Sequence, residues 1–429
     1  MATEEKKPAH TEPAKEEIWK HILINGPTRL EVSNPKSPKG RLEYLDKIRP
    51  FNTIDSEGKT IKPTVDLAEK EKRKLYQTFF KKPFKNLLIL SGAGSSVDVG
   101  GKMISELWDL AEKEYTEKGF KAIKDAISYT EDGKNLESLL SRIDGYQKFA
   151  VDKEVELEPS KKKLSEIRER LFKLIKDNCN ILVKPKDPFP HKVFLEKVLQ
   201  RKQTSSRVKI FTLNYDRLFE QAATEANAIV IDGFSFTTPR TFSGRFFDYD
   251  IVQREGSKLK EEDNFVQRVF HLHKLHGSLD WHREKDGPVI IDPNTKDPLM
   301  VYPRDAKYED SYEQPFFEMM ARFQRNLRLN DDTLLICVGY SFNDKHINTA
   351  IEEALNQNPS FRLAVIDPGF DNENSSKPLK TIVAEAKRSE RILMVAETFS
   401  DFAEHFPEIQ TYKDTEYRTI SLRNERKED

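Results

Sequence analysis

The sequence predicts a doubly wound α/β fold, in which helices cover both faces of a mostly parallel sheet. Short apolar runs alternate with longer segments of helical periodicity along most of the 429 residues. Runs such as LLIL and LLICV lack polar alternation, which is typical of strands buried on both faces. We expect strands at Leu87–Leu90, Arg207–Leu213, Ala228–Ile231, Val269–Leu275, Thr333–Val338, Arg362–Ile366 and Arg391–Val395.

A glycine-rich turn, Gly92-Ala93-Gly94-Ser95-Ser96, follows the first of these strands, and a helical pattern begins near Met103. Glycine allows a tight turn and a close approach of the backbone to a ligand, because it has no Cβ. The order of strand, turn and helix directs backbone N–H groups and a positive helix end toward a phosphate. A tight turn that binds nothing is the alternative for so short a motif.

The chain divides into four segments by composition and pattern, the third of which contains an insertion. Residues 1–17 are charged with few large apolar groups, and we expect a flexible tail there. Residues 18–66 are too short for a core of their own, so this extension must pack on the main domain or on another subunit. The main domain spans 67–410, with a helical insertion at about 103–207 that is too long for one crossover connection. Residues 411–429 form a charged tail.

The overall charge disfavours nucleic acid or a membrane as the main partner, because Lys+Arg number 71 and Asp+Glu 72. The two cysteines, Cys179 and Cys337, are too few for a disulfide framework or a thiolate zinc site. No apolar run approaches the roughly 20 residues of a membrane span. We therefore expect a soluble, cytoplasmic protein.

Polar or glycine-containing turns follow three further strands, and one carboxylate follows a fourth. Ligands of open α/β sheets lie outside the carboxyl ends of the strands, so these turns are expected to meet at one site. Their sequences are Thr212-Leu213-Asn214-Tyr215-Asp216, Lys274-Leu275-His276-Gly277-Ser278 and Gly339-Tyr340-Ser341-Phe342-Asn343-Asp344, with Asp367 after the sixth strand.

Structural alternatives exist for these side chains. Asn214 can instead cap the helix that follows it, as Asn often does. Four histidines, His271, His273, His276 and His282, suggest a metal site, but the first two share one strand face and His276 points the other way. No carboxylate or cysteine spacing supports a metal, so we expect none.

The aromatic segment Gly233–Leu259 is expected to form a long loop over a site. Its rings Phe234, Phe236 and Phe246 either line a ligand pocket or pack the loop, and we favour packing.

In combination and order, these motifs resemble the sirtuin superfamily, over about residues 87–401. Gly92-Ala93-Gly94 with Ser96 is similar to the GAG-x-S loop of that family, and Thr212-x-Asn214-x-Asp216 to its T-x-N-x-D strand end. His276-Gly277 resembles its catalytic histidine-glycine pair, and Gly339-x-Ser341 its later G-x-S turn. The resemblance implies a Rossmann-like sheet that binds NAD.

The departures from that family are informative. Sirtuin deacylases carry two C-x-x-C pairs for a structural zinc, and this chain has none. Met103-Ile104-Ser105 replaces the family's Asp-Phe-Arg, and Leu213 replaces a glutamine. The phrases KLHGSLDW, GYSFNDKHIN and NLESLLSRID resemble the zinc-free sirtuin-like proteins of bacterial anti-phage defence, which are NAD⁺ glycohydrolases.

This resemblance implies an NAD-depleting defence effector, with NAD as substrate and without zinc. Asn214 would fix the ribose or the attacking water, His276 would act as base, and Asp216 would orient Asn214 or the ribose. Asp367 would accept from the adenosine ribose. The remaining NAD contacts would come from Gly92, Ala93, Gly94, Ser95, Ser96, Thr212, Gly339 and Ser341.

Because free NAD⁺ hydrolysis would kill the host cell, we expect gating by a homo-oligomer or by a partner. The resemblance suggests a HerA-type ATPase, with a short Argonaute or another sensor as the alternative. Two other functions stay open: a non-catalytic NAD or ADP-ribose sensing module, and a protein deacylase, which the missing cysteines disfavour.

Overall fold

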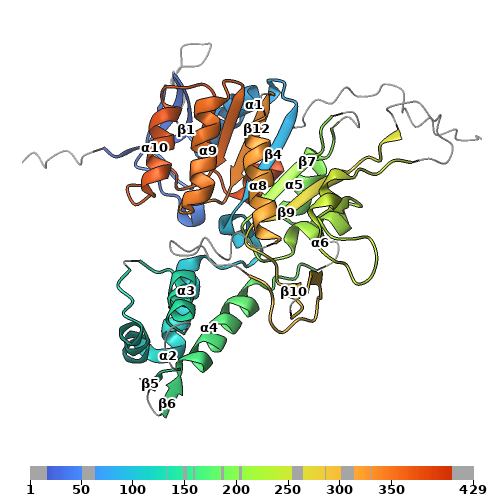
Figure 1. The fold of residues 1–429 in the computed structure, drawn as a ribbon. Coiled ribbons are helices and arrows are strands. Elements are labelled where there is room, and N and C mark those ends of the chain that lie inside the picture. The colour runs from blue at the N-terminus through green and yellow to red at the C-terminus, as the bar shows by residue number, and fades with distance from the viewer. Residues whose placement is uncertain are drawn as a thin grey trace, which may run out of the picture.

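A ten-stranded sheet crosses the molecule in the computed structural model (Figure 1). The structure describes residues 17–50, 63–131, 133–147, 152–157, 160–184, 188–201, 205–253, 264–285, 287–300, 314–329 and 331–407. The strand order is β3-β2-β1-β14-β13-β12-β4-β7-β9-β8. The strands from β14 to β8 are parallel to one another, which confirms the predicted fold class. They are β4 (Asn86–Ser91), β7 (Val208–Thr212), β8 (Ile229–Ile231), β9 (Val269–Lys274), β12 (Thr333–Val338), β13 (Phe361–Ile366) and β14 (Ile392–Val395).

The carboxyl ends of the central strands lie side by side. The last residue of β4, Ser91, is opposite Thr212 of β7 on one side and opposite Val338 of β12 on the other. Thr212 is in turn opposite Lys274 of β9. The chain leaves β4 toward β7 and later returns to the other side of β4 as β12. The β4–β12 boundary is therefore the point where strand order reverses, which is where ligands of such sheets bind.

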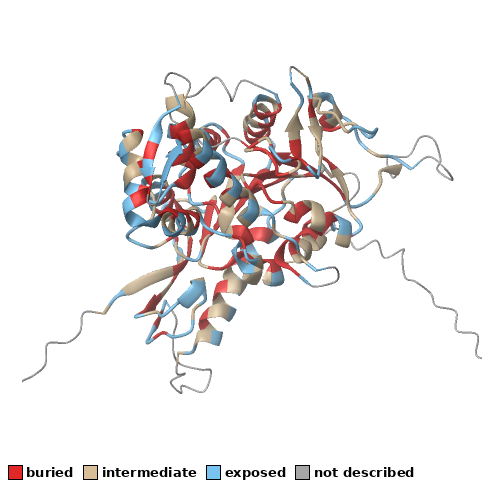
Figure 2. Ribbon diagram, turned by 90° about the horizontal axis from the view of Figure 1, so that it is seen from below, coloured by how far each residue is buried: buried red, intermediate tan, exposed pale blue. Residues whose placement is uncertain are grey.

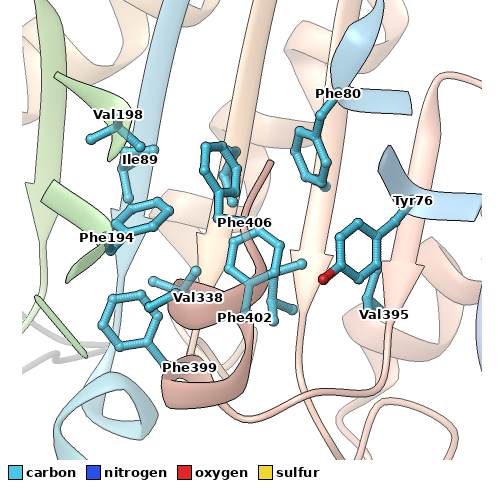
Figure 3. Close-up of a cluster of buried hydrophobic side chains, with 14 of the residues drawn as sticks. Tyr76, Phe80, Ile89, Phe194, Val198, Val338, Val395, Phe399, Phe402 and Phe406 are labelled. Carbon is cyan, nitrogen blue, oxygen red and sulfur yellow. The ribbon is translucent and has the colours of Figure 1, made fainter. Parts of the chain in front are cut away.

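Apolar side chains of the sheet alternate between two packed layers. Leu87 and Ile89 of β4 belong to one layer, and Leu88 and Leu90 to the other. Figure 3 shows the first layer, where Phe194 lies beside Ile89 and packs against Phe402. Figure 2 shows how the buried residues concentrate between sheet and helices. Helices of the first layer are α1 (Val65–Lys81), α5 (Pro190–Val198), α6 (Leu218–Glu225) and α11 (Phe399–His405); those of the second are α8 (Phe316–Leu327), α9 (Lys345–Gln357) and α10 (Lys377–Ala386).

The N-terminal extension adds three antiparallel strands to the β14 edge of the sheet, β1 (Trp19–Asn25), β2 (Thr28–Ser33) and β3 (Ile48–Arg49). Leu23 pairs with Val395, and Leu23 and Ile24 are fully buried within this chain. The extension therefore packs on its own domain, and its role as a subunit interface stays a prediction. Part of the predicted segment, 51–62, lies outside the described residues.

A separate helical unit lies beside the carboxyl edge of the sheet (Figure 1). It contains α2 (Ile104–Ala126), α3 (Leu136–Gln147), α4 (Leu164–Cys179) and the hairpin β5–β6 (Glu154–Leu157, Ser160–Lys163), packed around a third apolar cluster. α5 instead packs on α6 and α11 against the main sheet. We therefore place the end of the insertion after α4, earlier than the predicted residue 207.

One buried histidine of α5 gives a prediction about stability. His191 is fully buried against Phe219 and Phe399, and neither ring nitrogen has a hydrogen-bond partner. Burial lowers the pKa of His191 to about 4. We expect His191→Phe to raise the free energy of unfolding by about 1–3 kcal/mol, because it removes two unpaired polar atoms.

The gain from His191→Phe should grow as pH falls from 6.5 toward 4. Between these pH values His191 is protonated in the unfolded wild-type chain but neutral in the folded one. Protonation therefore stabilises the unfolded state of the wild type as pH falls, and the variant lacks this effect. Chemical denaturation of both proteins at several pH values measures the difference. A difference that does not change with pH would contradict this explanation.

Candidate active site

A pocket of about 500 Å³ lies between the carboxyl edge of the sheet and the helical insertion. Loops after β4, β7, β9 and β12 line one side, and the starts of α2 and α3 and the end of α4 line the other. Such a volume is typical of small-molecule sites. Eight of the predicted site residues line it: Gly92, Ala93, Ser96, Asn214, Asp216, His276, Gly339 and Ser341.

The glycines after β4 and β12 allow the two loops to pack backbone against backbone. The Gly94 amide donates to the Gly339 carbonyl at 2.9 Å, and the Gly92 amide donates to Val338 at 3.0 Å. A Cβ on Gly92 would lie 2.7 Å from the Gly339 oxygen, so a larger residue does not fit. The amides of Gly92, Gly94 and Ser95 all have protein acceptors. Ala93 and Ser96, both in the short helix η2 (Ala93–Val99), line the pocket, and the role of this loop in phosphate binding stays a prediction.

Asn214 is 9% exposed and is fixed to the loop after β4 by its side-chain nitrogen. Nδ2 donates to the Gly92 carbonyl at 3.1 Å and to the hydroxyls of Ser95 and Ser96 at 3.2 and 3.0 Å. Its backbone amide donates to the Thr212 hydroxyl at 3.1 Å. Because the nitrogen donates to protein atoms, the amide oxygen is the atom that can accept a hydrogen bond from a ligand hydroxyl or a water molecule.

Asp216 connects the loop after β7 with its surroundings. Its Oδ2 accepts from the Ser96 hydroxyl at 2.7 Å, and its Oδ1 accepts from the Leu218 amide at 3.1 Å in the first turn of α6. Asp216, and not Asn214, is thus bonded to an amide at the start of α6, whose N-cap residue is Arg217. The backbone oxygen of Asp216 accepts from the buried Lys274 ammonium, which also donates to Glu220 at 2.9 Å. These contacts favour an orienting role for Asp216.

His276 lies beside a carboxylate, Asp344, which the sequence analysis placed in the turn after the fifth strand without giving it a role. Its Nε2 is 3.3 Å from Oδ2 of Asp344, and both side chains are less than 15% exposed. Asp344 also caps α9 by accepting from the amides of His346 and Ile347. Burial alone would raise the pKa of Asp344, but His276 and the two amides outweigh it and lower the pKa, so this carboxylate is charged at neutral pH. An Asp directly before a helical pattern was the available signal.

Glu137 of the insertion is a second residue to which the sequence analysis gave no role. It lines the pocket from the first turn of α3, and it is 9% exposed. Oε1 of Glu137 accepts a hydrogen bond from the Tyr215 hydroxyl at 2.8 Å. Burial raises the pKa of Glu137, while the charge of His276 and the bond from Tyr215 act in the opposite direction.

Asp367 does not line this pocket. It lines another of about 440 Å³ between the end of β13 and the N-terminal extension. Its Oδ1 accepts from the Gly369 amide at 2.7 Å, and burial raises its pKa. Three other predicted residues do not line the first pocket but lie next to residues that do. Ser95 and Thr212 are hydrogen-bonded to Asn214, and Gly94 follows Ala93 in the chain. The predicted contact of Asp367 with adenosine ribose stays a prediction.

The described rings of the aromatic loop that was expected over the site pack on β9 and on one another. Phe247 stacks on His273 with ring centroids 4.2 Å apart, and Phe234 is buried, whereas Phe236 is 61% exposed. The described pocket lining includes none of residues 233–253, and residues 254–259 of the predicted loop lie outside the described residues. His271 and His273 lie on the same face of β9 within this packing, beside the Phe247 ring.

No group of three or more His, Cys, Asp or Glu residues that could hold a metal ion occurs in the part of the chain that the structure describes. Within the same residues, every helix is too short or too polar to cross a membrane.

The arrangement of these loops on a parallel sheet agrees with a comparison of the sequence with known families. Residues 208–391 match the model of the SIR2-like domain. The matched segment contains Asn214, Asp216, His276 and Asp344, while the loop after β4 and the helical insertion precede it. No curated protein matches the chain. Among solved structures, one of Sir2 with a deacetylated p53 peptide and 3′-O-acetyl ADP-ribose is similar at 12% identity and a TM-score of 0.35, covering 77% of this chain and 96% of that one.

Proposed function

We propose that the pocket binds NAD⁺ and hydrolyses its nicotinamide–ribose bond to nicotinamide and ADP-ribose. The SIR2-like match supports the use of NAD. The observation that carries the proposal is the meeting of Asn214 and His276, from the ends of two strands, in one pocket beside the charged Asp344.

The side chains of the pocket fit this reaction. Cleavage of a glycosidic bond passes through an oxocarbenium-like state, and nicotinamide leaves NAD⁺ as a neutral molecule that needs no acid. The amide oxygen of Asn214 can accept a hydrogen bond from the attacking water or from a ribose hydroxyl. As the water oxygen bonds to the ribose carbon, His276 can take its proton, and the Asp344 carboxylate stabilises the imidazolium that forms.

Two other functions remain alternatives, and each would give a different result when the protein is incubated with NAD⁺. A deacylase would transfer the acyl group of a lysine to ADP-ribose, and the two cysteines of the chain, Cys179 and Cys337, cannot supply the four thiolates of the deacylase zinc module. A sensing module would bind NAD or ADP-ribose without cleaving it.

The test is incubation of the purified full chain with NAD⁺, followed by mass analysis of the products. We expect nicotinamide and ADP-ribose in equal amounts, with and without a metal chelator, and no dependence on an acetyl-lysine peptide. NAD⁺ that is bound but recovered intact would favour the sensing module. Nicotinamide release that requires the peptide would favour the deacylase.

We further propose that this activity serves as the NAD-depleting effector of an anti-phage defence system. The support is the sequence resemblance of KLHGSLDW, GYSFNDKHIN and NLESLLSRID to such proteins, together with the need to restrain an enzyme that destroys NAD⁺. The restraint would come from a homo-oligomer and from a partner, either a HerA-type ATPase or another sensor. Light scattering of the purified protein, and NAD⁺ turnover with and without the neighbouring gene product, test these assignments.

A further inference from the structure

We propose that Glu137 and Tyr215 are positioning residues, whose hydrogen bond lets the helical insertion hold Asn214 in its working position. The inference rests on the proposed function, in which Asn214 acts on the reacting bond. If this hydrogen bond holds Asn214 in place, the site is complete only while the insertion is docked on the sheet.

The bond joins two parts of the chain that fold around different cores. Glu137 belongs to α3 of the insertion, and Tyr215 follows β7 of the main sheet. The Tyr215 hydroxyl donates to Glu137 Oε1 at 2.8 Å, and the two residues are 5% and 9% exposed. A buried hydrogen bond of this kind specifies one arrangement, because any other leaves a buried polar atom unpaired.

Tyr215 connects the insertion to both proposed catalytic loops. It lies between Asn214 and Asp216 in the chain, so a movement of its backbone moves the Asn214 side chain. The Tyr215 carbonyl accepts a hydrogen bond at 3.1 Å from the amide of Leu279, which lies in the loop after β9 that carries His276. Tyr215 therefore contacts the insertion through its side chain and the loop after β9 through its backbone.

Among the described residues, the core of the insertion includes residues of the main domain. Its apolar cluster contains three buried side chains from outside the insertion, Tyr215, Leu279 and Met300. The first two adjoin the loops that carry Asn214 and His276. A further bridge is the Lys176 ammonium, which donates to the Thr295 carbonyl at 2.7 Å. Displacement of the insertion would therefore act first on the two loops that the proposed reaction needs.

The test compares Tyr215→Phe, Glu137→Leu and Glu137→Gln in the full chain, with Glu169→Leu on the exposed face of α4 as the matched control. Tyr215→Phe keeps the ring in the apolar cluster and removes only the donor. We expect it and Glu137→Leu to lower kcat for nicotinamide release by about 10- to 100-fold with little change in KM, because a small misplacement of a reacting group costs that much. Glu137→Gln keeps an acceptor for the hydroxyl, so it should stay close to the wild type, as should Glu169→Leu.

The double variant Glu137→Leu/Tyr215→Phe should be no worse than either single variant, since both remove the same bond. Full activity of Tyr215→Phe would overturn the inference, and so would a Glu137→Gln variant as inactive as Glu137→Leu, which would mean that the charge acts directly.

Hydrogen exchange separates this inference from the proposed function. We expect the amides of residues 213–217 to exchange faster in Tyr215→Phe and Glu137→Leu than in the wild type, Glu137→Gln or Glu169→Leu. Equal exchange in all proteins would overturn the positioning role. A wild-type protein that releases no nicotinamide would refute the proposed function, whereas the exchange rates would still decide whether the bond orders the Asn214 loop.

Discussion

His276→Ala and Asn214→Ala are each expected to abolish nicotinamide release from NAD⁺ while the fold stays intact. His276 is the proposed base, and a positioned base contributes about 10²- to 10⁴-fold to such a reaction. Asn214 holds the water or ribose hydroxyl on which that base acts. Since the two residues serve one step, the double variant should be little slower than either single variant. Chromatographic detection of nicotinamide measures the loss, and thermal unfolding checks the fold.

Two further variants sharpen this result. His346→Ala is the control, because His346 is exposed on α9 and lies outside the described pocket lining. Asp344→Asn keeps a good helix-capping side chain but removes the charge beside His276, so we expect an intermediate loss of kcat. Full turnover by either purified alanine variant would refute the assignment of roles.

Gly339→Ala is expected to destabilise the protein strongly and to prevent NAD⁺ binding. Gly339 has a φ of +60°, which costs an alanine about 1–2 kcal/mol. An added Cβ would also lie 2.2 Å from the Ser95 nitrogen and 2.5 Å from the Gly94 carbonyl carbon, both backbone atoms that cannot move without opening the contact between the two loops. Such overpacking adds about 1–3 kcal/mol or more to the loss.

The matched control for this variant is Gly100→Ala. Gly100 has a φ of +96°, yet no atom lies within 4 Å of its added Cβ. Its variant should therefore lose only the conformational part of the free energy of unfolding. Denaturant unfolding of both variants measures the difference, which is a lower limit for the loop contact, because alanine is less favourable at a φ of +96° than at +60°. Equal losses would show that the crossing of the loops after β4 and β12 contributes little to stability.

The strands and the loops that follow them could be predicted from the sequence, because both depend on local pattern. The run Leu87–Leu90 carries no polar residue, and all four of its residues are fully buried in the sheet. Parallel strands align their carboxyl ends, so Asn214 and His276 were expected in one place once their strands were recognised. The observed register of Ser91, Thr212 and Val338 brings those loops together at the pocket.

Only the tertiary structure decided which other groups face this pocket. Glu137 is separated from Tyr215 by 78 residues and Asp344 from His276 by 68, so no local periodicity relates either pair. The N-terminal strands join the edge at β14, where unpaired backbone groups required a partner that no pattern in the extension identifies. Asp367 ends a strand of the same sheet but lines a different pocket. In each case the position follows from how separate units dock, which depends on the shapes of the packed surfaces and not on the order of residues along one element.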